Sequence, residues 1–332
     1  MLAIGKPLEL TLAGREPCEK IQLTPHGVKL HWLADGALLV SPPPAQDQDL
    51  DLLLSAGIHG NELIPIHVLD RLIRALARGD VQPRARLLLL FANPAAMRKL
   101  VRQVEHDLNR LFCGVHADVW GSEAIRAAEL EALVSGFFSL PGRQRRHYDL
   151  HSAMRPSRLA QFAICPWREG EQLSPKALAC LQGLAIDGVL LQHQASSTFS
   201  AMTATLHGAD AFTVELAEGK GETLPSAVLQ FEHGLNAMIE GRALPAVMQE
   251  SPQLLQISRE IIKRSPGFRL YVPADIENFA PLPLGSVLAE DDGKRWIVDE
   301  PDARILFPMA DVAVGQRAAL IVTPLEASEP KR

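Results

Sequence analysis

Cysteine is scarce in this chain of 332 residues, and the four that occur stand far apart, at positions 18, 113, 165 and 180. No two of them form the Cys-x-x-Cys pair that thiolate metal sites use, so we expect no such site. We expect the four thiols to be reduced and largely buried, as in an intracellular protein.

An excess of positive charge is also missing. The chain carries 33 Lys and Arg residues against 39 Asp and Glu residues, which gives a formal net charge of −6. Nucleic-acid binding needs concentrated positive charge, so we expect no nucleic acid as a partner. The arginine-rich run at residues 143–146 predicts a solvated loop and not a binding patch.

Long apolar runs are absent as well. No stretch reaches the roughly 18 uninterrupted apolar residues that a membrane-spanning helix needs, and residues 1–20 lack the apolar segment of a signal peptide. We therefore expect no membrane partner and a cytoplasmic location. With 47% hydrophobic residues and no repeat or low-complexity tract, the chain can form one large domain and a small one.

The chain does show a clear alternation of strand and helix patterns. Residues 50–56 predict a buried strand, residues 63–77 a helix with apolar residues at helical spacing, and residues 86–92 a second strand. This βαβ order implies parallel strands in an α/β sheet. Further helices are predicted at 122–138, with Ser122 as N-cap, and at 225–240, and further strands at 148–151, 161–165, 188–192 and 211–216.

The pattern changes near residues 242–252. Helical periodicity fades there, and short β-rich runs punctuated by Pro and Gly follow at 269–272, 286–289, 296–298, 304–307 and 318–322. We therefore predict two domains, an α/β domain over residues 1–245 and a smaller β-rich domain over residues 246–332.

His59 and Glu62 stand where the first predicted strand gives way to its helix. Residues at i and i+3 project toward the same side of a turn or helix start, and Gly57 and Gly60 allow the backbone to turn sharply after the strand. One imidazole and one carboxylate on the edge of a strand supply two of the three protein ligands of a catalytic zinc site.

His151 and Glu215 are candidates to complete such a site. His151 ends a predicted strand, at the carboxyl edge where α/β proteins bind their ligands. With His59 and Glu62 it forms a His/Glu/His zinc set that leaves a fourth position open. Glu215 lies inside an apolar strand, where a carboxylate is costly unless it is paired or functional. It is either a general base beside the metal or an edge-strand residue that faces water.

Arg102, Asn109 and Arg110 lie on one polar stretch between the predicted strands. An Asn-Arg pair can bind a carboxylate through forked, charge-assisted hydrogen bonds that Lys cannot reproduce, and Arg102 could face a developing oxyanion. The alternative interpretation is a solvated helix face with mixed charges.

Six segments in this order closely resemble the succinylglutamate desuccinylase/aspartoacylase family, a branch of the zinc carboxypeptidase fold. They are GIHGNE at 57–62, NPAA at 93–96, Arg102, DLNR at 107–110, DLH at 149–151 and VEL at 214–216. The resemblance runs from about residue 45 to ILFP at 305–308 and VGQR at 314–317. The overall length, the loop at 196–200 and these C-terminal segments are more similar to the desuccinylases than to the aspartoacylases. The implied fold is a mixed α/β sheet flanked by helices, with a smaller C-terminal β-domain.

Carried over by position, the resemblance implies one zinc ion per chain, held by His59, Glu62 and His151. It also implies that Glu215 is the catalytic glutamate and that Arg102 polarises the scissile carbonyl.

The resemblance further implies that Asn109 and Arg110 hold a carboxylate of the substrate and that Arg155 contacts a second one. The implied reaction is zinc-dependent hydrolysis of the amide bond of N-succinyl-L-glutamate to succinate and glutamate. This is the last step of the arginine succinyltransferase route of arginine breakdown.

Three alternatives stay open. The same scaffold could deacylate another N-acyl amino acid, such as N-acetylaspartate. It could be a true carboxypeptidase, although the missing secretion signal argues against most of those, or it could be an inactive metal-binding protein. A small-molecule substrate is the partner we expect, and the sequence leaves open whether the chain forms a homo-oligomer.

Overall fold

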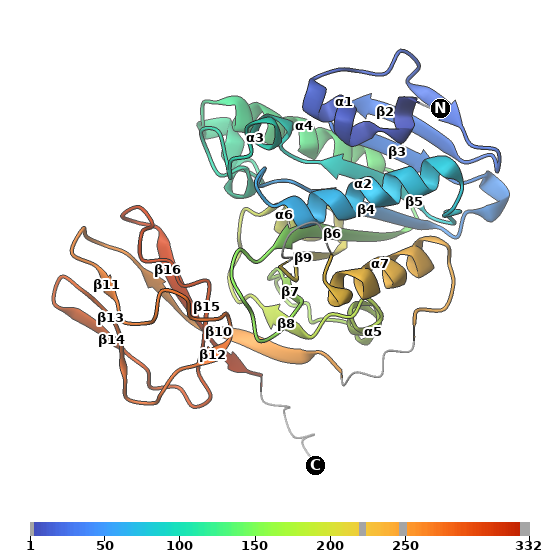
Figure 1. Cartoon of the computed structure of the whole chain (residues 1–332). Helices are drawn as coiled ribbons and strands as arrows, with labels where there is room; N and C mark the ends of the chain where they lie inside the picture. Colours follow the sequence, from blue (N-terminus) through green and yellow to red (C-terminus); the bar gives the residue numbers. More distant parts are fainter. Residues whose placement is uncertain (1–2, 219–223, 246–250, 326–332) are drawn as a thin grey trace.

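The computed structural model describes residues 3–218, 224–245 and 251–325, which form helices and strands around one long sheet (Figure 1). The helices are α1 Pro7–Ala13, α2 Leu63–Arg78, α3 Pro94–Lys99, α4 Ser122–Phe137, α5 Pro175–Gly183, α6 Phe199–His207 and α7 Ser226–Ile239. The first nine strands are β1 Ile21–Leu23, β2 Lys29–Ala34, β3 Ala37–Ser41, β4 Leu50–Ala56, β5 Arg86–Phe91, β6 Gln144–Ser152, β7 Phe162–Cys165, β8 Gly188–Leu191 and β9 Asp210–Leu216. The C-terminal strands are β10 Gln253–Ile262, β11 Arg269–Leu270, β12 Ala280–Pro281, β13 Val287–Asp291, β14 Lys294–Ile297, β15 Arg304–Leu306 and β16 Arg317–Pro324.

The large sheet is mixed and has 13 strands in the order β1-β2-β3-β5-β4-β6-β9-β7-β8-β10-β16-β15-β12 within the described residues. Its centre is parallel, because β4 pairs with both β5 and β6, and β6 pairs with β9, in parallel register. The predicted βαβ unit is confirmed, with α2 connecting β4 to β5. The predicted mixed α/β fold is therefore correct.

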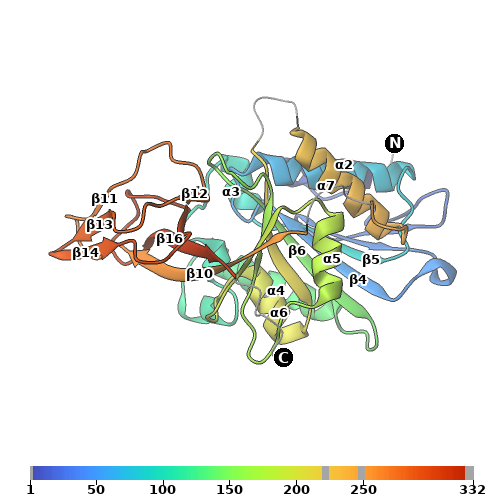
Figure 2. The same cartoon turned by 90° about the horizontal axis from the view of Figure 1, so that it is seen from below.

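Helices cover both faces of the parallel centre because successive strand residues point to opposite sides. Leu52 and Leu54 pack with residues of α2, α5 and α7 in one buried cluster, whereas Leu53 packs with residues of α4 and α6 in another. Figure 2 shows α2 and α7 on one side of the sheet and α4 and α6 on the other. No helix in the described part of the chain is long and apolar enough to cross a membrane.

The C-terminal β-region continues the large sheet. β10 runs parallel to β8 on one side and antiparallel to β16 on the other, so it joins the two parts of the chain. A small apolar cluster that includes Phe162, Leu255 and Phe279 seals this junction. The predicted boundary between residues 245 and 246 adjoins residues 246–250, which lie outside the described residues, and the division into two domains stays a prediction.

β10 was not predicted because its residues are only partly buried and its pairing with β16 is interrupted by two register shifts, which break the alternation of apolar and polar residues. The N-cap prediction for α4 is wrong as well. Ser122 is the first residue inside the helix, Gly121 takes the cap position, and the Ser122 hydroxyl donates to Glu123.

The prediction of a solvated loop at residues 143–146 is also wrong. Arg143 forms ion pairs with Asp47, Asp49 and Asp51, and the following arginines lie in β6, where Arg146 is buried. All four cysteines are free, as expected, but only one of them, at position 180, is buried, because those at 18 and 113 are exposed and that at 165 is half-buried.

The turn that carries His59 and Glu62 is packed against α3 through Gly60. A Cβ atom on Gly60 would lie 2.2 Å from the carbonyl carbon of Ala96 and 2.3 Å from the backbone nitrogen of Met97. The Gly60 N–H also donates to the carbonyl of Arg102 at 3.3 Å. The absence of a side chain at residue 60 therefore lets the site turn sit directly on the neighbouring backbone.

We predict that Gly60→Ala lowers the free energy of unfolding by about 1–3 kcal/mol, because the added methyl group displaces backbone atoms that cannot move independently. Gly136→Ala is the matched control, since Gly136 is an exposed helical residue whose Cβ would meet nothing within 4 Å. The control should be neutral or slightly stabilising. Urea unfolding of both variants measures this, and equal stabilities would contradict the packing argument.

Candidate active site

The turn between β4 and α2 places His59 and Glu62 at the carboxyl edge of the parallel strands. Gly57 takes a positive φ of 70°, a conformation that glycine adopts without strain, and redirects the chain out of β4. Glu62 occupies the N-cap position of α2, yet its carboxylate makes no capping hydrogen bond to that helix. The carboxylate is instead directed at two imidazole rings.

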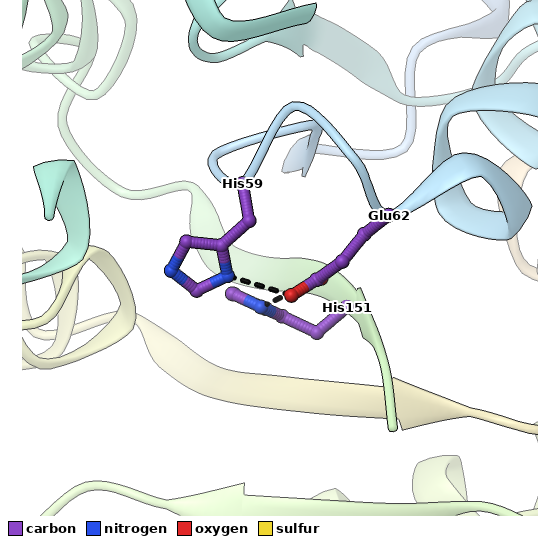
Figure 3. Close-up of side chains that lie close together, drawn as sticks. All are labelled: His59, Glu62 and His151. Carbon is purple, nitrogen blue, oxygen red and sulfur yellow. Dashed lines mark hydrogen bonds and ion pairs between the residues drawn. The ribbon is translucent and has the colours of Figure 1, made fainter. Parts of the chain in front are cut away.

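Glu62 stands between His59 and His151 (Figure 3). Its Oε1 atom is 2.7 Å from Nδ1 of His59, and its Oε2 atom is 3.1 Å from Nδ1 of His151. The backbone N–H of Ser152 also donates to Oε2, at 3.2 Å. All three side chains are buried, and one ligand atom from each lies within 4.8 Å of the others. The structure thus brings together the three residues that the sequence analysis selected as ligands.

Each imidazole is also hydrogen-bonded, through the ring nitrogen opposite Glu62, to a second carboxylate. Nε2 of His59 donates to Asp107 at 3.0 Å, and Nε2 of His151 donates to Asp149 at 3.0 Å. Metal-ligating histidines usually donate their second N–H in this way, which fixes the tautomer and the ring orientation. Both rings therefore present Nδ1 toward Glu62.

Asp107 and Asp149 belong to the DLNR and DLH motifs, but no role was predicted for either residue. A signal existed for Asp149, because residues two apart on a strand project to the same face. Asp149 and His151 are both in β6. Asp107 lies 48 positions from its partner His59, and no local pattern in the sequence connects the two.

The charges of this cluster support one another. Burial by itself would raise the pKa of the Glu62 carboxyl, but the charges and hydrogen bonds of His151 and His59 outweigh burial and lower it. Burial would lower the pKa of His151, yet Glu62 and Asp149 raise it well above the usual value. An ionised carboxylate and two imidazole nitrogens are the donor set that divalent zinc accepts. Binding of such a cation would have to displace the proton that Glu62 stabilises on His151.

Glu215 lies beside this cluster on β9. The parallel register of β6 and β9 pairs its Cα with that of His151. Glu215 is buried in a strand with neighbours on both sides, so the alternative of an edge-strand residue facing water is wrong. Burial raises the pKa of its carboxyl to about 7, with the positive charge of His151 opposing this shift and the negative charge of Glu62 adding to it.

Arg102, Asn109 and Arg110 lie on the loop after α3 and in a short 3₁₀ turn at Leu108–Arg110. They do not form a helix face, so that alternative is also wrong. Arg102 is half-exposed, 3.2 Å from Asp107 and 3.7 Å from Glu62 Oε1.

Asn109 is buried, and its side-chain oxygen accepts from the backbone N–H of Phe199 at 2.9 Å. This bond directs its amide nitrogen toward His151, at 3.4 Å from Nε2. Arg110 is exposed, and one of its terminal nitrogens donates to its neighbour's carbonyl.

Two arginines change the expected picture of the site. Arg155, which the resemblance assigned to a substrate carboxylate, donates to the backbone carbonyls of Ala274, Ile276 and Pro308. It therefore binds the C-terminal β-region to the loop that follows His151. Arg317, the first residue of β16, was not selected from the sequence.

Arg317 belongs to the same charged region as the loop after α3. Burial and then the positive charge of Arg110 lower the pKa of its guanidinium, and Arg102 acts in the same direction. Glu260 is its acidic neighbour, at 3.9 Å. The C-terminal β-region thus adds positive charge next to the residues predicted to bind a carboxylate.

Fold and site together define an α/β protein with a buried His-Glu-His group that could hold a metal ion at the carboxyl edge of its parallel strands. The chain belongs to the succinylglutamate desuccinylase/aspartoacylase family. The model of that family's catalytic domain matches residues 48–242, and the model of the AstE/AspA barrel-sandwich hybrid domain matches residues 250–325.

Similar proteins cover the whole chain. Succinylglutamate desuccinylase of Pseudomonas fluorescens (strain Pf0-1) is 54% identical over 98% of this chain and 98% of its own. The same-named protein of Pseudomonas syringae pv. tomato is 53% identical over 98% of this chain and 99% of its own. Among solved structures, succinylglutamate desuccinylase of Vibrio parahaemolyticus has a TM-score of 0.89 at 30% identity, covering 98% and 97% of the two chains. That of Chromobacterium violaceum has a TM-score of 0.84 at 33% identity, covering 98% and 99%.

The raised pKa of Glu215 predicts a pH-dependent stability that can be measured after metal removal. The unfolded chain ionises this carboxyl near its ordinary pKa of 4.5, whereas the folded chain keeps it neutral up to about pH 7. Its contribution is therefore fully present below pH 4.5 and is lost as the pH rises through 7. Relative to Glu215→Gln, the wild-type protein should lose on the order of 2–3 kcal/mol of unfolding free energy between pH 5 and pH 8.

Urea unfolding of the two chelated proteins at both pH values measures this difference. Titrating groups that do not interact with Glu215 are common to both proteins and cancel in the comparison. A difference in stability that stays constant with pH would contradict the buried, neutral carboxyl.

Proposed function

We propose that this chain is a zinc-dependent amidohydrolase that cleaves N-succinyl-L-glutamate to succinate and L-glutamate. The observation that carries the proposal is the buried His-Glu-His group with Glu215 beside it. The family membership and the names of relatives that are 50–54% identical over nearly the whole chain support the substrate. As the last step of the arginine succinyltransferase route of arginine catabolism, the reaction would take place in the cytoplasm.

The residues fit one zinc ion per chain. The two Nδ1 atoms and one Glu62 oxygen are three protein donors of the kind found in catalytic zinc sites, which leave a further position open. Asp107 and Asp149 supply the outer hydrogen bonds that such ligands use. When bound, zinc would supply Lewis-acid chemistry that activates water and polarises the amide carbonyl.

Glu215 is suited to carry protons in both directions. Its carboxylate would accept a proton from the attacking water and then deliver it to the departing amine nitrogen of glutamate. A pKa near the working pH serves both tasks, because the group has to be ionised for the first step and protonated for the second. Burial away from bulk water keeps the transferred proton on this carboxyl.

Arginines suit the negative charges of this substrate, which carries three carboxylates. Arg110 and Asn109 would hold one of them, and Arg102, which is not buried, would turn toward the oxygen of the scissile carbonyl as negative charge develops there. Arg317 adds to the positive field in the same region. Concentrated positive charge in a chain of net charge −6 supports an anionic small molecule as the substrate.

We predict that purified protein hydrolyses N-succinyl-L-glutamate, loses this activity after treatment with a chelator, and regains it when zinc is added. A panel of N-acyl amino acids that includes N-acetyl-L-aspartate measures the preference for the acyl group and the amino acid. Faster turnover of N-acetyl-L-aspartate would favour the aspartoacylase alternative. No turnover of any member by zinc-loaded protein would favour the inactive metal-binding protein.

We predict that Glu215→Gln retains about one zinc ion per chain but loses most of kcat, by about 10²–10⁴-fold, because proton transfer is lost while the ligands remain. Near-normal kcat in the variant would remove Glu215 from this role.

In the wild-type protein the rising limb of the pH profile of kcat/KM should lie at or below pH 7, since a bound cation lowers the pKa of the Glu215 carboxyl from about 7.

We predict that Arg110→Ala mainly raises KM, because the proposed carboxylate contact exists in both the ground state and the transition state. Arg78→Ala is the matched control, since Arg78 is an exposed arginine at the end of α2 that forms an ion pair with Asp80 on the surface. Steady-state kinetics of both variants measure the effect. A fall in kcat alone for Arg110→Ala would contradict the contact.

A further inference from the structure

A line of buried polar side chains extends from His151 away from Glu62 and into the sheet. Asp149 accepts from His151 through Oδ2 and from the Ser55 hydroxyl through Oδ1, at 3.0 Å and 2.6 Å. Oγ of Ser55 is 2.8 Å from Nε2 of His147, and Nδ1 of His147 is 2.8 Å from the hydroxyl of Thr203. Ser55, His147, Asp149 and Thr203 are all completely shielded from solvent, each with 0% exposure.

The sheet register brings these residues together. His147, Asp149 and His151 alternate along β6, so they share one face of that strand. Ser55 on β4 is the Cα partner of Asp149, and Thr203 reaches the same face from α6. The ring of Phe199 packs edge-on against the ring of His147, with centroids 4.8 Å apart.

The hydrogen bonds of Ser55 fix where the protons lie between His147 and Asp149. Both oxygens of Asp149 accept hydrogen bonds, Oδ2 from Nε2 of His151 and Oδ1 from the Ser55 hydroxyl. Ser55 has a single hydroxyl proton, which it donates to Asp149, so its oxygen must accept from Nε2 of His147.

His147 therefore carries its proton on Nε2. Burial lowers its pKa to about 4, so the ring is neutral and its Nδ1 is an acceptor for the Thr203 hydroxyl, which also lies 3.0 Å from the Ser200 carbonyl. His147 and Ser55 thus donate in sequence toward Asp149. The Asn109 amide also lies near Nε2 of His151, at 3.4 Å, but the bond to the Asp149 carboxylate is shorter.

We propose that Ser55 and His147 are positioning residues for the metal site. By donating in sequence toward Asp149, they leave Oδ2 of that carboxylate as the acceptor for His151, which keeps the proton of His151 on Nε2 and reserves Nδ1 for the cation. This inference rests on the proposed metal-binding function, and it adds two residues beyond the direct partners of the ligands.

A purely structural role would not need this direction. Buried polar groups must be hydrogen-bonded, but apolar residues of similar volume would fill the same space without that requirement. Donation from His147 to Ser55 and from Ser55 to Asp149 instead leaves Asp149 as the acceptor for Nε2 of His151, so that Nδ1 of His151 is free. Metal affinity, and not only fold stability, should therefore depend on it.

The experiment compares zinc affinities by competition with a chromogenic chelator. Ser55→Ala removes the donor to Asp149, and we expect its zinc affinity to fall by about tenfold or more. Ser200→Ala is the matched control. It also removes a buried hydroxyl with a 2.8 Å hydrogen bond, to Thr213, but that pair has no bond to a proposed ligand or to Asp149. Its zinc affinity should stay within about threefold of the wild type.

A second pair of variants tests His147 without relying on Ser55→Ala. His147→Gln places an amide N–H close to the position of Nε2, so it can still donate to Ser55, and Thr203 can turn to the Ser200 carbonyl that lies 3.0 Å away. His147→Leu fills the space but donates nothing. We expect zinc affinity to fall by about tenfold in His147→Leu and to be largely restored in His147→Gln.

The outcomes distinguish a failure of the proposed function from a failure of the positioning role of Ser55 and His147. Wild-type protein that does not bind zinc would overturn the proposed function itself. Tight binding by the wild type with an unchanged affinity in Ser55→Ala would overturn only the positioning role. Equal losses in Ser55→Ala and Ser200→Ala, or in both His147 variants, would show a general loosening of the core and would also overturn it. If Ser55→Ala fails to fold, the His147 pair decides the question.

Discussion

The Glu62 carboxylate, buried between two imidazoles, is the interaction on which the rest of the site depends. An ionised carboxylate away from water is very costly unless it is paired and hydrogen-bonded. Here it has His59 on one oxygen, and His151 with the Ser152 backbone on the other. Because Glu62 comes from the turn after β4 and His151 from the end of β6, this one group fixes two strand ends relative to each other.

The surrounding sheet explains how distant residues reach this point. Parallel strands end at a common edge, and β4, β6 and β9 are neighbours in the central sheet. The proposed ligands therefore come from two of these strand ends and Glu215 from the third. The C-terminal β-region is held next to the same edge by Arg155, and it brings Arg317 into the charged surroundings. Both parts of the chain thus border the candidate site.

Much of this arrangement could be predicted from the sequence, and the reasons are physical. The strand over Leu50–Ala56 and the helix after it were predicted because a continuous apolar run and a helical period are separated by glycines that permit one turn. His59, Glu62, His151 and Glu215 were selected because polar side chains at the ends of apolar strands, or inside them, need a reason to be there. The zinc ion, the substrate and the roles of these residues remain proposals.

Other features depend on contacts between residues far apart in the chain. The pairing of Asp107 with His59 crosses 48 positions, and that of Ser55 with Asp149 crosses 94, so no local pattern indicates either. Arg143 looked like part of a solvated loop because its three acidic partners precede it by more than 90 positions. The strand β10 was not predicted because most of its residues are partly exposed and its register shifts interrupt the alternation of buried and exposed positions.

The central claim is that these three side chains hold one cation through the nitrogens that the outer carboxylates leave free. The most direct measurement is a crystal structure of zinc-loaded protein with diffraction recorded at the zinc absorption edge. The account predicts one anomalous peak per chain, at roughly 2.0–2.2 Å from Nδ1 of His59, Nδ1 of His151 and a Glu62 oxygen. A peak at another place in the chain, or coordination through the Nε2 atoms, would contradict it.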